Sequence, residues 1–249
     1  MSGHSKWATI KHKKAAVDKA RGKLFAKLAR QIEVSAREGG GDPDSNASLR
    51  TMVLKAKAAQ MTNDAIDRAI KRGMGEQTGA SYESITYEGY APGGVALLID
   101  VLTDNRNRTS GDVRAVFSKY GGAMAEPGAV GWQFSRKGIV IVDGRAGEDD
   151  VMVAALEAGA EDIARDGDAW KVTTEPSVVF DVKAALEAAG LTVLSAESTM
   201  VSSNLVPVDD VDDAKKVLRI MDALEDNDDV QDVYSNFDMS DDIMTAASA

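Results

Sequence analysis

The chain has no cysteine and only two histidines among its 249 residues. Without cysteine, disulfides, thiolate nucleophiles and cysteine-based metal sites are excluded. The two histidines, His4 and His12, have few carboxylates beside them, and we expect neither a metal ion nor another cofactor. No Walker loop, GxSxG motif or HExxH motif occurs either. We therefore expect no catalytic residue and no enzymatic activity.

Long apolar runs are also missing. None approaches the roughly 18 residues that a membrane-spanning helix needs, and the N-terminus lacks the apolar centre of a signal peptide. We expect a cytoplasmic protein with no membrane contact. The 44% hydrophobic content is nevertheless enough for hydrophobic cores, and a chain of this length predicts roughly two to three domains.

Charge is distributed very unevenly along the chain. Residues 1–37 contain ten Lys or Arg against two Asp or Glu, whereas residues 143–249 contain seven basic and 26 acidic side chains. The whole chain has a formal net charge of −11. A basic segment on an acidic protein is typical of a polyanion binder, and nucleic acid is the first candidate.

The basic segment has helical periodicity. Between residues 15 and 37, apolar side chains recur every three or four positions, and basic side chains recur to one side of them. This pattern predicts a helix with one face toward a core and a cationic face toward solvent. Further helices are predicted from Asp44 or Ser45 and from Thr62, which completes a three-helix bundle. The basic face comprises Lys19, Lys23, Lys27, Arg30 and Arg37.

Two other segments supply candidate nucleic-acid-binding residues. In the loop at 104–110, two arginines precede a helix that Thr109 or Ser110 could cap, an arrangement suited to a phosphate. The alternative is a surface loop whose polar groups bond only to backbone. Near the N-terminus, an indole lies among lysines and could stack on a base or cover the edge of the bundle. The candidates are His4, Lys6, Trp7, Lys11, Lys13, Lys14, Arg106 and Arg108.

An acidic cluster at 209–213 has two interpretations. It could bind a cation, but it lacks the glycine and the distal glutamate of a calcium loop. Acidic side chains also favour the N-terminus of a helix, and we prefer that interpretation.

The remaining pattern predicts an α+β fold. Residues 136–205 have the element order β-α-β-β-α-β of a ferredoxin-like unit. The flanking segments, 80–135 and 206–240, together predict a second, discontinuous α+β sandwich. The predicted architecture is a basic helical domain at 1–79 followed by two ferredoxin-like α/β sandwich domains, one inserted in the other. Residues 241–249 are predicted to form a flexible tail.

Six motifs carry a further signal: Gly3-His4-Ser5-Lys6-Trp7, Lys11-His12-Lys13-Lys14, Gly39-Gly40-Gly41-Asp42-Pro43, Tyr87-Glu88-Gly89-Tyr90, Pro92-Gly93-Gly94 and Asp104-Asn105-Arg106-Asn107-Arg108-Thr109. Together they resemble the YebC/PmpR family, which is related to the mitochondrial translational activator of cytochrome c oxidase. The resemblance implies three domains and no enzymatic activity. It also implies action on the ribosome, where members relieve stalling at sequences such as consecutive prolines, although bacterial members are commonly labelled DNA-binding transcriptional regulators.

Two binding functions follow from these patterns, and the favoured one is a translation factor that contacts ribosomal RNA. The alternative is a transcriptional regulator that contacts DNA. The basic face is mainly lysine, which suits phosphate contacts, and no helix-turn-helix pattern with base-reading side chains is present. A third, less favoured hypothesis is an acidic protein-interaction module. We expect a monomer.

Overall fold

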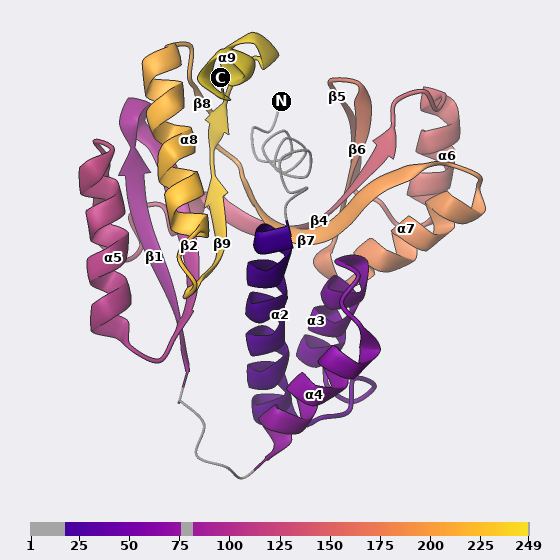
Figure 1. The fold of residues 1–249 in the computed structure, drawn as a ribbon. Coiled ribbons are helices and arrows are strands. Elements are labelled where there is room, and N and C mark those ends of the chain that lie inside the picture. The colour runs from indigo at the N-terminus through magenta and orange to yellow at the C-terminus, as the bar shows by residue number, and fades with distance from the viewer. Residues whose placement is uncertain (1–17, 76–81, 249) are drawn as a thin grey trace.

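The N-terminal helical domain is a bundle of three helices (Figure 1). The computed structural model describes residues 18–75 and 82–248, with side chains from residue 22 onward in the first range. The cap of the second helix is Asn46, whose Oδ1 accepts a hydrogen bond from the Leu49 amide (3.0 Å), instead of the predicted Asp44 or Ser45. The helices are α2 (Asp18–Gly39), α3 (Ala47–Ala58) and α4 (Asn63–Met74).

The bundle is held by its own small apolar core. Leu28, Ile32 and Ala36 of α2 are buried against residues of α3 and α4, as the helical periodicity predicts. Leu24 belongs to the same predicted face but is exposed, because the core begins one turn later. The closest approach is at Gly73 of α4, where an added Cβ would lie 2.3 Å from the carbonyl oxygen of Glu33.

The second part of the fold is a four-stranded antiparallel sheet in the order β3-β1-β2-β9. This sheet and its two helices, α5 and α8, are called the α5–α8 layer below. Helices α5 and α8 cover one face, and the central strand β2 is buried along nearly its whole length. Its elements are β1 (Glu83–Ala91), η1 (Pro92–Gly94), β2 (Val95–Thr103), α5 (Arg106–Lys119), β3 (Ala123–Ala125), α8 (Val211–Glu225) and β9 (Val230–Ser235).

The third layer is another four-stranded antiparallel sheet, in the order β5-β6-β4-β7. This order, with α6 and α7 packed on one face, is the ferredoxin-like arrangement that the element order predicts. The mixed α+β fold class is therefore confirmed. Its elements are η2 (Gly131–Gln133), β4 (Phe134–Asp143), α6 (Glu148–Glu157), β5 (Asp162–Asp166), β6 (Ala169–Thr174), η3 (Pro176–Val178), α7 (Val179–Ala188) and β7 (Val193–Ser202).

The chain enters and leaves the third layer at neighbouring points. The amide of Ser203 donates a hydrogen bond to the carbonyl oxygen of Gln133 (2.9 Å), and the strands of this sheet all lie between β3 and β9 in the chain. These contacts support the proposal that the segment is an insertion. The boundaries at 136 and 205 stay a prediction.

The C-terminal segment differs from its prediction. Residues 241–248 are not a flexible tail: they form helix α9 (Asp241–Ser248), and Met244 is only 1% exposed in the core beneath α8. The prediction of a flexible tail rested on the acidic composition of this segment and overlooked the apolar side of the helix. The adjoining parallel pair is β8 (Val206–Pro207) and β10 (Phe237–Asp238). No helix in the described ranges is long and apolar enough to cross a membrane.

The close approach at Gly73 gives a test of the bundle. Gly73→Ala should lower the melting temperature, because the new methyl group overlaps the Glu33 carbonyl and overpacking costs about 1–3 kcal/mol. Gly22→Ala is the matched control, since no atom lies within 4 Å of a Cβ at that helical position. It should leave stability unchanged or raise it by up to about 1 kcal/mol. Calorimetry of the two variants measures both effects, and equal melting temperatures would contradict this packing.

A second test addresses the inserted unit. A fragment of residues 133–203 contains all of β4 and β7 and is expected to fold alone, because its ends already lie together. Circular dichroism should show mixed α+β structure and one cooperative thermal transition. A spectrum of unfolded chain would refute the proposed insertion.

Candidate nucleic-acid interface

The basic face of α2 contacts the turn between α8 and β9, residues 225–229, which we call the acidic turn. The prediction that this face points to solvent is therefore wrong for three of its cations. A periodic pattern shows that a face is polar but not what the tertiary fold places against it. The hydrogen bonds run from Lys23 Nζ to Asp226 O (3.1 Å) and Oδ1 (3.0 Å), from Lys27 Nζ to Glu225 O (2.6 Å), and from an Arg30 guanidinium nitrogen to Asp228 O (3.1 Å) and Asp229 Oδ1 (3.3 Å).

Asp229 binds side chains from several elements of this region. Its nearly buried carboxylate accepts hydrogen bonds from Arg108 (2.7 Å), Thr109 (2.7 Å) and Thr103 (3.1 Å), and it also pairs with Arg30. Burial acts to raise the pKa of Asp229. The hydrogen bonds from the arginine and the two threonines outweigh burial and hold that pKa below its ordinary value. One carboxylate thus connects β2, α5, β9 and α2.

The 104–110 loop is organised differently from the prediction. Asn105 caps α5 by accepting a hydrogen bond from the Arg108 amide (3.1 Å), so the helix begins before the predicted caps, and Thr109 lies buried in its first turn. Arg108 also pairs with Asp104 (2.9 Å), which leaves it engaged on both sides. Arg106 is exposed and forms no ion pair within residues 18–75 and 82–248. Arg108 therefore fits neither interpretation, because its guanidinium binds two side-chain carboxylates of the protein itself. The role of Arg106 stays a prediction.

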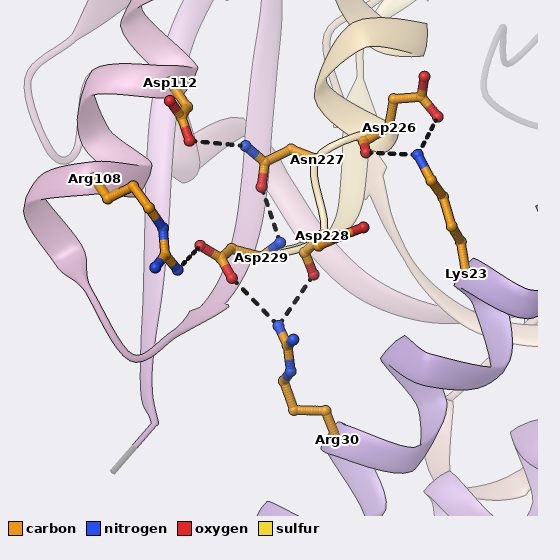
Figure 2. Close-up of a pocket in the computed structure, with 8 residues that line it drawn as sticks. All are labelled: Lys23, Arg30, Arg108, Asp112, Asp226, Asn227, Asp228 and Asp229. Carbon is orange, nitrogen blue, oxygen red and sulfur yellow. Dashed lines mark hydrogen bonds and ion pairs between the residues drawn. The ribbon is translucent and has the colours of Figure 1, made fainter. Parts of the chain in front are cut away.

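These side chains border a cavity of about 430 Å³ between α2, α5 and the acidic turn. Figure 2 shows Lys23 and Arg30 reaching from α2 toward the turn, while Arg108 approaches Asp229 from the opposite side. Asn227 bridges the turn to Asp112 of α5 (3.5 Å). Because acidic and basic groups alternate along its walls, the cavity has no single charge to attract a free ion.

Other predicted candidates fall outside these contacts. Arg37 forms an ion pair with Glu33 one turn earlier on α2 (3.1 Å). The side chain of Lys19 lies outside the described residues. So do six further candidates: His4, Lys6, Trp7, Lys11, Lys13 and Lys14.

Four cations that the sequence analysis did not single out extend the basic surface. They are exposed on the outer sides of α3 and α4. The count of basic residues contains the signal for them, because six of the 16 Lys and Arg residues in 1–72 lie after residue 37. These residues are Arg50, Lys57, Arg68 and Lys71.

The acidic cluster at 209–213 forms the N-terminus of α8. Asp210 caps the helix by accepting a hydrogen bond from the Asp213 amide (2.9 Å). Residues 18–75 and 82–248 contain no group of three potential metal ligands close enough to hold an ion. The helix-terminus interpretation therefore describes this cluster.

Asp229 gives a testable prediction for stability. Asp229→Asn should lower the free energy of unfolding by about 1.5–3 kcal/mol, because hydrogen bonds to a charged partner are weakened and Arg108 loses the nearer of its two counter-charges. Asp228→Asn is the matched control, since this neighbouring side chain is exposed, and its effect should stay within about 0.5 kcal/mol. Urea unfolding at pH 7 measures both, and equal effects would contradict the role of Asp229.

The same variant should change the acid sensitivity. The folded-state pKa of Asp229 is held below its ordinary value, so its contribution to stability is complete well above that ordinary value and is lost as the pH falls through the lowered pKa. Asp229→Asn should remove this part of the acid dependence. Parallel acid-stability curves for the variant and the original chain would show that Asp229 is not responsible.

Comparisons with known proteins agree along the whole chain. Residues 5–76 match the family described as the TACO1/YebC protein N-terminal domain, and residues 82–237 match the TACO1/YebC second and third domain. A protein of Rubrobacter xylanophilus named probable transcriptional regulatory protein is 57% identical over 98% of each chain. A protein of the same name from Mycolicibacterium smegmatis is 54% identical over 98% of this chain and 97% of its own.

A solved structure shows the same architecture. The crystal structure of a conserved hypothetical protein from Aquifex aeolicus has a TM-score of 0.78 and 42% identity, and the match covers 91% of this chain and 94% of that one. The family matches, the curated relatives and the shared fold confirm the resemblance drawn from the motifs. The chain belongs to the TACO1/YebC family.

Proposed function

We propose that this protein is a nucleic-acid-binding regulator of gene expression that acts on the ribosome, where it contacts ribosomal RNA and relieves stalled translation. Regulation of gene expression is supported by the names of its relatives. Relief of stalling, for example at consecutive prolines, rests on the family resemblance. The single observation that carries nucleic-acid binding is the concentration of positive charge in the N-terminal helical domain.

That domain is basic on more than one side. Residues 1–72 have a net charge of +9, whereas residues 143–249 have a net charge of −19. Within the described part of the domain, Arg50 and Lys57 are exposed on α3, and Arg68 and Lys71 are exposed on α4. Basic groups on several helix surfaces suit an irregular ligand that surrounds the domain, with its phosphates as the common feature.

The side-chain types favour RNA over a regular duplex. The basic residues of 1–72 are largely lysines, which bind phosphates as point charges, and the sequence has no helix-turn-helix pattern with base-reading side chains. Folded RNA offers single-stranded loops and closely spaced phosphates that a small basic domain and an exposed Arg106 can reach. We therefore place the helical domain toward ribosomal RNA and the acidic layers away from it.

DNA binding is the second candidate function. The observation that favours it is the name probable transcriptional regulatory protein carried by relatives that are 57% and 54% identical. A basic domain of this kind also binds DNA without sequence preference. The two functions therefore differ in the specific partner and not in the electrostatic contact.

Charge reversal tests the proposed contact with the ribosome. Lys13→Glu with Lys14→Glu, or Arg106→Glu alone, should abolish co-sedimentation with ribosomes and rescue of a proline-rich stalling reporter. Arg219→Glu is the matched control, because this exposed arginine lies on α8 among the acidic layers, and it should bind normally. Arg108 is left intact because its reversal would disrupt Asp229. Unchanged circular dichroism confirms that each variant is folded.

Two outcomes would contradict the proposal. One is normal ribosome association by all the variants. The other is nanomolar binding to one promoter at physiological salt with about a thousandfold preference over other DNA, which is characteristic of a specific transcriptional regulator. Failure of the intact protein to bind any polynucleotide would instead favour the acidic protein-interaction module.

A further inference from the structure

The acidic turn presents to α2 the same chemical groups that a nucleic acid would present. Helix α8 ends at Glu225, so its last carbonyl groups have no partner within the helix and carry the negative end of the helix dipole. Lys27 and Lys23 donate to the carbonyl oxygens of Glu225 and Asp226. Carboxylates add formal charge at the same place. The amines of α2 thus meet a row of oxygens with negative charge, as they would on a phosphate backbone.

Polar contacts, and not a shared hydrophobic core, hold the helical domain against the acidic turn. In the described ranges, the apolar cluster of the bundle draws only on residues 25–70, and the clusters of the two sheets begin at residue 87 or later. Further links include Arg30 with the carbonyl oxygen of Leu102 (3.4 Å), Lys55 with Asp232 (3.3 Å) and Arg30 above the ring of Tyr82 (5.0 Å). An interface made of charge is sensitive to a competing charged ligand.

The outermost contact of this interface is also a weak one. In the pair of Lys23 and Asp226, the side chains are 35% and 79% exposed. Exposed pairs contribute little, typically about 0.2–1 kcal/mol, whereas the pair of Arg30 and the nearly buried Asp229 is better shielded. A polyanion can therefore begin to displace the turn at Lys23 and advance along α2 toward Arg30.

We infer that the acidic turn is a built-in competitor that covers the polyanion-binding face of α2, and that nucleic-acid phosphates displace it and move the helical domain away from the α5–α8 layer. This inference rests on the proposed function and adds its regulation. The free protein is closed, and a single isolated phosphate cannot open it, because several contacts must be exchanged together. The cost of opening selects extended or folded polyanions over small anions.

Affinity measurements with a matched pair of variants test the competition. Asp226→Lys places a positive charge beside Lys23 and should open the interface. Asp209→Lys makes the same change in net charge at an exposed position before the opposite end of α8. In fluorescence anisotropy with an oligouridylate at fixed salt, Asp226→Lys should bind about three- to tenfold more tightly than Asp209→Lys.

A distance measurement observes the movement directly. Because the chain has no cysteine, Ala58→Cys on α3 and Ser118→Cys on α5 provide unique spin-label positions, and both are exposed. Adding oligouridylate should lengthen the label distance, and Asp226→Lys should lengthen it without RNA. Lys23→Asp combined with Asp226→Lys should restore the short distance by restoring an opposite-charge pair.

The outcomes separate this inference from the function on which it rests. Binding of oligouridylate with an unchanged label distance, or equal affinities for the two Lys variants, would overturn the competition and leave the proposed function standing. If neither the original chain nor any variant binds RNA or DNA, the proposed function fails and the inference fails with it. Tighter binding, RNA-dependent lengthening and rescue by the charge swap together would establish the competition.

Discussion

The carboxylate of Asp229 fixes the part of the molecule where its layers meet. It is nearly buried, and it is stable as an anion only because two threonines and two arginines surround it. These partners come from β2, α5 and α2, while Asp229 itself immediately precedes β9. Removing this nearly buried anion takes a counter-charge from both Arg30 and Arg108, which is costly. The position of α2 against the α5–α8 layer therefore depends on this one residue and on the acidic turn that carries it.

When one chain has a strongly basic domain and strongly acidic parts, the two can form ion pairs with each other instead of with a ligand. In this protein the pairing involves α2, where carbonyl and carboxylate oxygens of the acidic turn bind three cations, and Lys55 of α3, which pairs with Asp232. The exposed cations of α3 and α4 remain outward. Opposite charges within the chain thus orient the domain, and the same charges make that orientation responsive to a polyanion.

Much of the fold could be predicted from local patterns. The helix predicted between residues 15 and 37 and the β-α-β-β-α-β order of the third layer follow from spacing alone, because each reflects one face or one segment meeting a core. The errors arose where contacts with distant parts of the chain override a local pattern. Asn105 caps α5 in place of the predicted Thr109, whose hydroxyl donates a hydrogen bond to Asp229 instead. The acidic C-terminal segment was predicted to be a flexible tail, but it forms a helix whose Met244 is buried.

The sequence by itself determined the charge separation, the amphipathic helices and the family, since each is written in residue types at fixed spacing. It could not determine which cations are free. Lys23 and Asp226 are 203 residues apart, and no local pattern relates them. Only the tertiary structure decided that Lys23, Lys27 and Arg30 meet the end of α8 while Arg106 stays exposed. The physical reason is that a charged side chain satisfies itself with whatever long-range packing brings within hydrogen-bond distance.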